Sequence, residues 1–278
     1  MTVRIITDST CDLPSGIVSK LGVCVLPLYI HAGNNDFLDG IDITRDDFYT
    51  RLPSFSTPPT TAVPSTIKFR AMYDSLADEG ASEVLSIHIS TTLSAIPNVA
   101  QTAAAETTSV PVTVFDSRQL SLGTGFLVQT AAELALAGNS VKEILPVLEE
   151  QIKRTYVWAA LDTLQYLRCS GRMNRVISSI GELIQMKPIL KMHDGISGVE
   201  RARTRKIAMA LLADRLRTYS PFEKIAFLHS DAQERAQALI HEVRDLLPEY
   251  ETWLEIINPT LGAHLGPGVV GFACISKK

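Results

Sequence analysis

The sequence predicts an α/β protein of two domains, with a mostly parallel, covered sheet in the first domain and a mixed sheet in the second. Three observations favour this class. Through the first half, short apolar runs alternate with longer amphipathic stretches, which is the pattern of parallel strands joined by helices. In the second half, His193-Asp194-Gly195 separates two apolar runs, which indicates an antiparallel hairpin. The length of 278 residues fits two domains, which we expect at 1–150 and 151–278.

The elements expected in the first domain follow from local patterns. Each strand is a run of apolar or β-branched residues that ends at a polar turn, and these runs are 3–7, 23–30, 84–89 and 110–115. Helices are expected after Pro14, after the N-cap residues Thr44 and Ser65, from about Pro97, at 125–137, and after the capping box of Ser140 and Glu143. The stretch 53–64 is rich in Ser, Thr and Pro, so we expect an exposed loop there.

The elements expected in the second domain are read in the same way. Apolar runs predict strands at 157–161, 189–192, 196–204, 225–229, 253–257 and 269–275. Helical spacing predicts helices at 163–172, 176–186, 206–219 and 232–247. Within the third of these helices, Ile207, Leu211 and Leu216 are expected to point inward.

Composition excludes several classes of protein. The hydrophobic fraction is 46% and the charged fraction 20%, which is too apolar for an intrinsically disordered chain. No run approaches the ~18 apolar residues of a transmembrane helix, and the first residues lack an export signal, so we expect a cytoplasmic protein. The four cysteines form no metal-binding or C-x-x-C pattern and are expected to be small buried apolar residues or free thiols in a reducing compartment.

The net charge of −4 argues against non-specific nucleic-acid binding, but it hides an uneven distribution. Residues 151–218 contain 13 Lys and Arg against 5 Asp and Glu, a net of +8, while the rest of the chain carries −12. A basic segment of this kind either docks an acidic partner or forms ordinary solvated helix faces. The sequence leaves both interpretations open.

Signatures of the common catalytic and cofactor sites are absent from the sequence. It contains no Gly-x-Ser-x-Gly elbow, no Walker A loop and no His-Glu-x-x-His motif. We therefore expect no cofactor and no metal, and binding rather than catalysis.

Hydroxyl side chains gather at one expected strand-to-helix turn. Ser90, Thr91, Thr92 and Ser94 follow the strand 84–89 and precede a helix. Backbone N–H groups at a helix N-terminus favour an anion, and in open α/β sheets ligands bind at the carboxyl ends of strands. The turn is a candidate site for a carboxylate or a phosphate, although ordinary N-capping would need only one of these hydroxyls.

Two further segments have the composition of a polar binding site. Thr57, Thr60, Thr61 and Ser65 form a second hydroxyl-rich loop, and His264 lies among glycines, which permit the backbone to approach a ligand closely. Each segment also has a plain structural interpretation, the first as a polar loop and the second as a turn before the last strand. Together, three such segments from distant parts of the chain suggest one pocket for a polar head group.

Short motifs follow one another along the whole chain. They are Asp8-Ser9-Thr10-Cys11-Asp12-Leu13-Pro14, Leu26-Pro27-Leu28, Thr61-Ala62-Val63-Pro64-Ser65, Ser90-Thr91-Thr92-Leu93-Ser94, Phe115-Asp116-Ser117, Leu164-Gln165-Tyr166-Leu167 with Gly171-Arg172, Lys187-Pro188-Ile189-Leu190, and Gly262-Ala263-His264-Leu265-Gly266-Pro267-Gly268. In this order they resemble the DegV family of fatty-acid-binding proteins over the full length of the chain.

The resemblance implies a two-domain α/β protein that holds a long-chain fatty acid between its domains and has no enzymatic activity of its own. It implies that Thr61, Ser94 and His264 bind the carboxylate while the acyl chain lies in an apolar tunnel. Some members of the family deliver the fatty acid to a separate kinase. This chain departs from the family pattern at Ala62-Val63, where Ser-Gln is usual, and at Ala95-Ile96, where Gly-Thr is usual. Both departures add carbon or remove polar groups near the head group.

The resemblance also places a basic residue, Arg172, near the pocket mouth or the partner surface. The candidate contacts to an acidic kinase are Arg172, Arg175, Arg201, Arg203, Arg205 and Lys206. An enzymatic alternative stays open, because the family's fold resembles that of dihydroxyacetone kinase and of a phosphotransferase-system domain. In that case His264 would accept a phosphoryl group or engage a carbonyl substrate.

Overall fold

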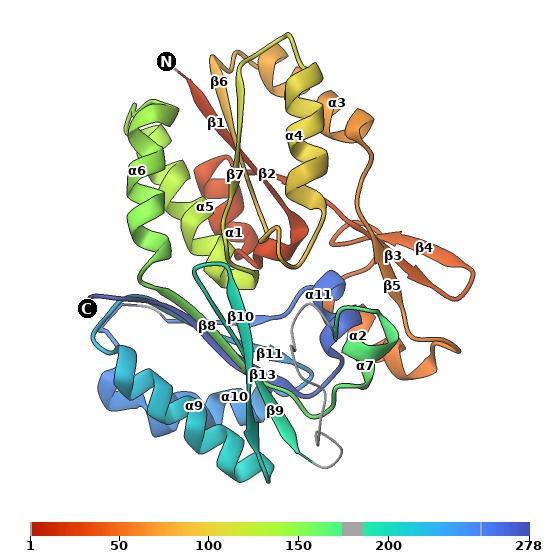
Figure 1. Cartoon of the computed structure of the whole chain (residues 1–278), viewed down its shortest axis with the longest axis vertical. Helices are drawn as coiled ribbons and strands as arrows, with labels where there is room; N and C mark the ends of the chain where they lie inside the picture. The colour runs from red at the N-terminus through yellow and green to blue at the C-terminus, as the bar shows by residue number, and fades with distance from the viewer. Residues whose placement is uncertain (1, 174–185, 251) are drawn as a thin grey trace.

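The structure is a computed structural model that describes residues 2–173, 186–250 and 252–278. A parallel sheet and a larger mixed sheet follow one another along the long axis of the molecule, and a small third sheet lies to one side (Figure 1). The α/β class with one parallel and one mixed sheet is the class that the sequence predicts. In the described part of the chain, no helix is long and apolar enough to cross a membrane.

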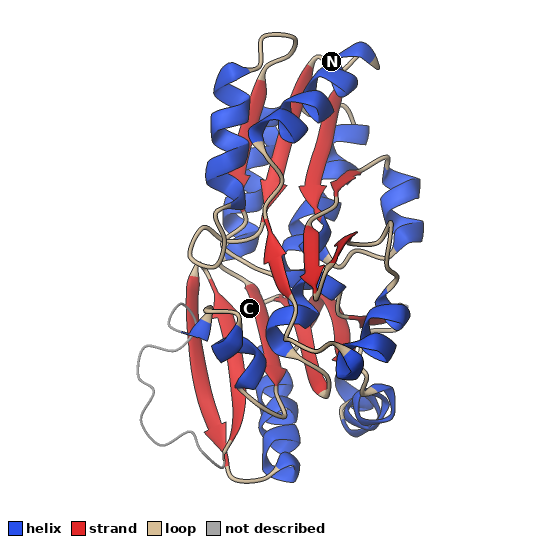
Figure 2. Cartoon of the chain, turned by 90° about the vertical axis from the view of Figure 1, so that its right-hand side faces the viewer, coloured by secondary structure: helices blue, strands red, loops and turns tan. Residues whose placement is uncertain are grey.

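The parallel sheet has the strand order β2-β1-β6-β7. Its strands are β1 (Val3–Asp8), β2 (Cys24–Leu26), β6 (Glu83–His88) and β7 (Val112–Asp116). Helices cover both faces (Figure 2). They are α1 (Ser15–Leu21), α3 (Thr66–Asp78), α4 (Ile96–Glu106), α5 (Ser121–Leu136) and α6 (Val141–Ile152).

The larger sheet has the order β10-β9-β8-β13-β11-β12 and is mixed, because β11 and β12 pair in parallel while the other neighbours are antiparallel. The predicted hairpin is confirmed as β9 and β10, with Ile196 opposite His193. The strands are β8 (Thr155–Ala160), β9 (Lys187–His193), β10 (Ile196–Ala202), β11 (Phe222–Ser230), β12 (Trp253–Ile256) and β13 (Val269–Ser276). Helices α9 (Arg205–Tyr219) and α10 (Gln233–Glu242) pack against it.

The third sheet corrects two predictions from the sequence. The expected strand 23–30 is two strands, β2 and β3 (Tyr29–Ala32), separated at Pro27, which has no backbone N–H to donate. The expected loop 53–64 contains the strand β5 (Thr60–Ala62). Strand β3 forms a local hairpin with β4 (Asn35–Leu38), in which Ala32 pairs with Asn35, and it also pairs with β5. The pairing with β5 joins segments about thirty residues apart, which local patterns do not reveal.

Helix ends and faces differ from the predictions in several places. The expected helix 125–137 begins earlier, at Ser121, and the expected helix 163–172 is reduced to α7 (Gln165–Cys169). The expected helix 232–247 ends at Glu242 and is followed by a 3-10 turn, Arg244–Leu246. The inward orientation predicted for Ile207 is wrong, since it is 45% exposed, whereas Leu216 is buried as predicted. The expected helix 176–186 falls almost wholly outside the described residues.

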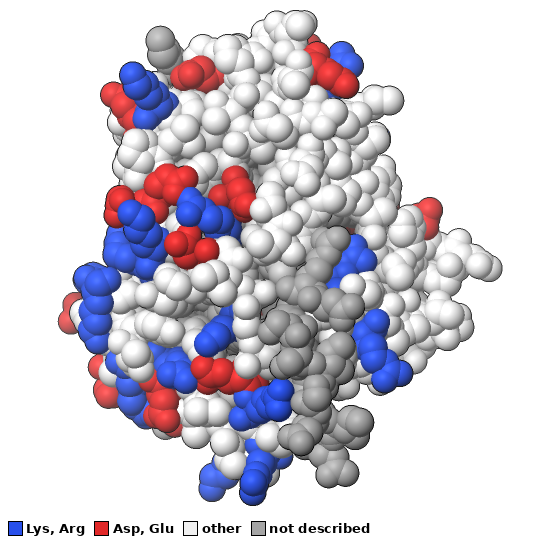
Figure 3. Space-filling view, viewed as in Figure 1, with Lys and Arg blue, Asp and Glu red and all other residues white. Residues whose placement is uncertain are grey.

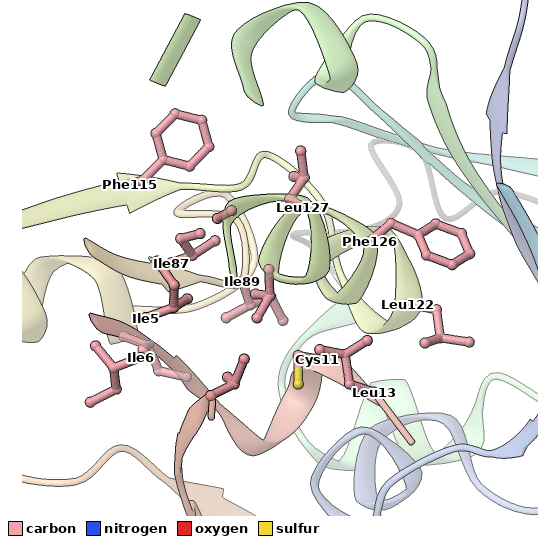
Figure 4. Packing of buried hydrophobic residues seen from close by; sticks show 14 of the residues in the cluster. Ile5, Ile6, Cys11, Leu13, Ile87, Ile89, Phe115, Leu122, Phe126 and Leu127 are labelled. Atoms are coloured by element: carbon pink, nitrogen blue, oxygen red, sulfur yellow. The ribbon is translucent and has the colours of Figure 1, made fainter. Parts of the chain in front are cut away.

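Helix α5 lies in the hydrophobic core between the two larger sheets. Its side chains Leu122, Phe126 and Leu127 project from different sides of the helix (Figure 4) and are almost fully buried. The helix packs on β1 and β6 of the parallel sheet and on β8 and β13 of the mixed sheet. One hydrophobic cluster therefore includes residues of both sheets. The domain boundary near residue 150 stays a prediction.

Candidate functional site

A deep cavity lies between the carboxyl ends of the parallel strands and the inner face of the mixed sheet. Including its mouth, it encloses about 960 Å³. It is lined by Thr10, Leu28, Thr61, Ala62, Val63, Ile89, Leu93, Ser94, Ile96, Leu120, Val157, Ala159, Leu167, Arg172, Leu190, Lys191, Met192, Ser197, Thr260, Leu261, His264 and Leu265. Most of these side chains are apolar, and neither Asp nor Glu is among the described residues that line the cavity.

The apolar wall on the mixed sheet follows from the alternation of strand side chains. Val157 and Ala159 on β8 pair with Met192 and Leu190 on β9, and all four side chains line the cavity. Residues two apart on a strand point to the same face, so these two strands present a continuous apolar surface. The cavity is also lined by residues that follow the parallel strands, among them Ile89.

The polar end of the cavity contains all three residues expected to bind a carboxylate. Thr61 on β5 and His264 on α11 (Pro259–Leu265) are 203 residues apart in sequence, yet Thr61 Oγ1 lies 2.9 Å from His264 Nε2. Ser94, in the loop between β6 and α4, lines the same cavity. The structure thus brings together Thr61, Ser94 and His264.

His264 lies on a helix, where the sequence suggested a turn. Asn258 is the N-cap, its side chain accepts a hydrogen bond from the N–H of Leu261 at 2.9 Å, and Pro259 occupies the first helical position. A Cβ at Gly262 would lie 2.5 Å from Tyr49 Oη. Close packing on a tyrosine that is itself buried therefore fixes the position of this helix. The pattern of Asn258-Pro259 is the sequence signal that would have predicted it.

The loop before α4 uses most of its hydroxyls for its own structure. Ser90 Oγ lies 2.9 Å from Thr92 Oγ1, and Thr91 donates to Asp116 at 2.6 Å. Ser94 Oγ accepts from the N–H of Ile96 at 3.3 Å, and its hydroxyl donates to no described residue. Ser94 is therefore the member of the predicted turn whose hydrogen is available to a ligand in this cavity.

Burial keeps the His264 imidazole neutral. Desolvation, with a smaller contribution from the positive charge of Arg172, lowers the pKa of His264 to about 4. His264 Nδ1 is buried and has no hydrogen-bond partner among the described residues. Because an unpaired buried donor costs more than an unpaired acceptor in this setting, we assign the proton to Nε2, which then donates to Thr61. The Thr61 hydroxyl hydrogen is left for a ligand.

The cations of the cavity differ in their surroundings. Arg172 is half-buried, lines the cavity, and donates to the carbonyl of Ser170 at 2.8 Å. Lys191 directs its Nζ away, 3.5 Å from a Glu200 oxygen and 5.4 Å from the centre of the Trp158 ring. The charge of Arg172 acts on His264 at the polar end, and the place expected for Arg172 at the pocket mouth or partner surface stays a prediction.

The other basic residues of the prediction lie outside the cavity. Arg201, Arg203 and Arg205 are exposed, and Arg205 is held by Asp162 through contacts of 3.0 and 2.9 Å. Arg201 and Arg203 have no ion pair with a described residue. Lys and Arg side chains gather over the lower half of the face in Figure 3, with acidic side chains between them. Arg175 lies outside the described residues.

Two threonines that the sequence did not single out also line the cavity. Thr10 donates to Asp8 at 2.5 Å, and Thr260 donates to Asp39 at 2.5 Å. Both carboxylates are buried, so each holds a threonine hydroxyl in place. Asp8 is only two residues from Thr10, whereas Asp39 is 221 residues from Thr260, so no local signal predicts the orientation of Thr260.

Comparison with known families gives a match over nearly the whole chain. A family model described as "Uncharacterised protein, DegV family" matches residues 2–277. A DegV domain-containing protein of Streptomyces coelicolor is 33% identical over 281 residues, covering 99% of this chain and 99% of the relative. Another, of Deinococcus radiodurans, is 34% identical over 277 residues and covers 98% of each.

Solved structures share the fold over its full length. A DegV family protein from Thermus thermophilus, described in terms of fatty acid binding, is 33% identical with a TM-score of 0.89, covering 99% of this chain and 100% of that one. DegV from Bacillus subtilis, described as a fatty acid binding protein, is 28% identical with a TM-score of 0.90 at the same coverage.

Proposed function

The chain belongs to the DegV family, and from this premise and its cavity we propose that it binds one long-chain fatty acid between its two larger sheets. The acyl chain would lie on the apolar wall, and the carboxylate would lie at the polar end, where Thr61 and Ser94 would donate to it while His264 orients the Thr61 hydroxyl. The observation that supports this most is the pairing of an apolar cavity, which no carboxylate of a described residue lines, with a hydroxyl and imidazole end. The relatives from Thermus thermophilus and Bacillus subtilis, described as fatty acid binders, support the same ligand class.

The affinity of such a complex would come mainly from the acyl chain. Each buried CH₂ contributes about 0.8 kcal/mol, so a long chain supplies ample binding free energy from buried area. The wall built from β8 and β9 offers that area, with Val157, Ala159, Leu190 and Met192 side by side. Affinity should therefore increase with chain length until the cavity is filled.

The head group would be held by hydrogen bonds and by one positive charge. Thr61 and Ser94 each have a hydroxyl hydrogen that donates to no described residue under the assigned His264 tautomer. A carboxylate buried without donors is costly, and two hydroxyl donors would offset that cost. Arg172 would add charge complementarity from the side of the cavity.

We place this activity in the cytoplasm and assign the chain no chemical step of its own. A histidine with a lowered pKa is a weak nucleophile, and its Nε2 already contacts Thr61. The phosphoryl-transfer alternative makes the opposite prediction. Incubation with labelled ATP or phosphoenolpyruvate would leave label on His264 in that case and none under the carrier proposal.

A carrier of this kind would present its carboxylate to a separate fatty-acid kinase. Arg201, Arg203 and Lys206 are exposed and have no ion pair with a described residue, so they are suited to an acidic partner surface. Charge reversal by Arg203→Glu should slow acyl-phosphate formation by a kinase, while the same reversal at exposed Lys20 on α1 should not. Equal rates for both variants would contradict this docking surface.

A matched pair of serine variants tests the head-group site. Ser94→Ala removes a donor from the cavity, whereas Ser65→Ala removes an exposed hydroxyl that makes no capping bond to α3. Ser94→Ala should weaken fatty-acid binding about tenfold, which corresponds to about 1.4 kcal/mol, and Ser65→Ala should leave it unchanged. Fatty-acid titration followed by fluorescence or calorimetry would measure both, and an unchanged affinity in Ser94→Ala would remove Ser94 from the site.

A further inference from the structure

A second cavity lies on the other side of one wall of the first. It encloses about 1350 Å³ including its mouth. Three segments form it, at residues 9–27, 39–46 and 254–258. The described residues that line it are Ser9, Cys11, Asp12, Leu13, Ser15, Val18, Val25, Pro27, Asp39, Gly40, Ile41, Arg45, Asp46, Leu254, Glu255, Ile256 and Asn258.

The wall between the two cavities at Asp39 consists of two hydrogen-bonded residues, Asp39 and Thr260. Thr260 lines the first cavity, Asp39 and Ser9 line the second, and Asp39 Oδ2 accepts from Ser9 at 2.9 Å and from Thr260 Oγ1 at 2.5 Å. No described residue lines both cavities. The second cavity is therefore a separate site rather than an extension of the first.

The second cavity has a strong excess of negative charge. Among the described residues that line it are four carboxylates, Asp12, Asp39, Asp46 and Glu255, and one guanidinium, that of Arg45. Arg45 lies 3.6 Å from Asp12 and 3.4 Å from Glu255. Asp12 also accepts hydrogen bonds from Ser121 and Asn258, while Asp39 and Asp46 have no ion pair with a described residue.

Asp39 is the side chain that indicates where a ligand would bind. It is 5% exposed, and while Oδ2 is hydrogen-bonded, Oδ1 receives no hydrogen bond from a described residue. Desolvation, with a smaller contribution from the charge of Asp12, raises the pKa of Asp39 to about 6. A cation beside Oδ1 would relieve the repulsion between Asp39 and Asp12.

We propose that this second cavity binds a small organic cation, a guanidinium or ammonium group on a short apolar body, against the free oxygen of Asp39. The cavity already holds a guanidinium of this kind in Arg45, between carboxylates and the carbonyl of Ile256. The apolar body would contact Ile41, which is 67% exposed, and Leu254. Within the described residues no group of His, Cys, Asp and Glu has metal-binding geometry, which favours an organic cation over a metal ion.

Titration of the whole chain with n-butylguanidinium tests the proposal, with n-butyrate as the matched anion. Isotope-labelled isoleucine methyl groups report on both cavities in one NMR spectrum, since Ile41 and Ile256 line the second cavity and Ile89 and Ile96 line the first. The cation should shift Ile41 and Ile256 saturably at millimolar concentration and leave Ile89 and Ile96 unshifted. The absence of a saturable shift at Ile41 and Ile256, or an equal shift with butyrate, would overturn the proposal.

Two variants fix the position of the cation. Asp39→Asn should weaken binding of n-butylguanidinium at least about tenfold, because it removes the charge beside the vacant oxygen. Glu255→Gln should weaken it less, and it serves as the test should Asp39→Asn fail to fold. Asp36→Asn, at an exposed carboxylate on β4 outside the cavity, should leave binding unchanged. Unchanged binding in both Asp39→Asn and Glu255→Gln would overturn the assignment.

Discussion

The two cavities lie on either side of one wall and have opposite chemistry. Among the described residues, the first is lined by hydroxyls, an imidazole, cations and no carboxylate, while the second is lined by four carboxylates. The difference arises in the wall, where Asp39 and Thr260 are hydrogen-bonded and face different cavities. A carboxylate placed behind a threonine keeps negative charge out of the cavity in which the family's ligand is proposed to bind.

Burial shifts the pKa of one side chain in each cavity, and the two shifts have opposite signs. It lowers the pKa of His264 in the first cavity to about 4 and raises the pKa of Asp39 in the second to about 6. In both cases desolvation favours the neutral form of the side chain. Each cavity therefore contains a buried group whose charged form a ligand of opposite charge would stabilise.

The largest effect should come from filling the first cavity. Ala159→Phe would place a ring on the apolar wall and displace about five methylenes of the acyl chain. At about 0.8 kcal/mol for each methylene, the binding free energy of the fatty acid should weaken by about 4 kcal/mol, which is about a thousandfold in affinity. Calorimetric titration would measure it. Binding of n-butylguanidinium should be unchanged, because Ala159 does not line the second cavity. Loss of both fatty-acid binding and n-butylguanidinium binding would show that the two cavities are not independent.

The second effect is a dependence of folding stability on pH in the ligand-free protein. The folded pKa of His264 lies below its unfolded value of 6.5, so the unfolded chain binds more protons between pH 6.5 and 4. The contribution of neutral His264 is present above pH 6.5 and is lost as pH falls toward 4, by about 3 kcal/mol. Denaturant unfolding of the wild type and of His264→Gln at a series of pH values would show it. A His264→Gln profile identical to the wild type would contradict the burial of a neutral imidazole.

Asp39→Asn is the control of opposite sign in the same experiment. The folded pKa of Asp39 lies above its unfolded value, so the folded chain binds more protons between pH 4 and 6. The wild type should therefore gain stability relative to Asp39→Asn as pH falls through this range, by less than the His264 effect because the shift is smaller. A relative loss in that range would contradict the charge balance assigned to the second cavity.

The smallest effect concerns the cation of the first cavity. Arg172→Gln should weaken fatty-acid binding about tenfold and reduce its dependence on salt, since it removes the positive charge near the head group. It should also raise the pKa of His264, because Arg172 lowers it. NMR titration of the histidine gives that second readout. Arg168→Gln, at an exposed arginine on α7, should change neither quantity.

Features that depend on neighbouring residues were predictable from the sequence. The N-cap Thr44 accepts from the N–H of Asp47, and Ser140 with Glu143 forms the capping box, both as predicted. The hairpin of β9 and β10 follows from its turn residues in the same way. In these cases the physical cause lies within a few residues of the effect.

Features that depend on distant partners were not predictable from local patterns. Strand β5 exists because Ile30 pairs with Thr61, and Thr260 has its orientation because Asp39 accepts its hydrogen bond. For Thr61, Ser94 and His264, short motifs pointed to one pocket and the structure places them in one cavity. Their role in binding a carboxylate stays a prediction.

Mass spectrometry of the purified chain tests the central claim most directly, first as the intact protein under native conditions and then after extraction with organic solvent. The account predicts one fatty acid per chain, bound from the host or taken up from a mixture of long-chain fatty acids, and its loss or marked reduction in Ala159→Phe. A wild-type chain that carries no fatty acid and takes up none from that mixture, while folded, would contradict the account.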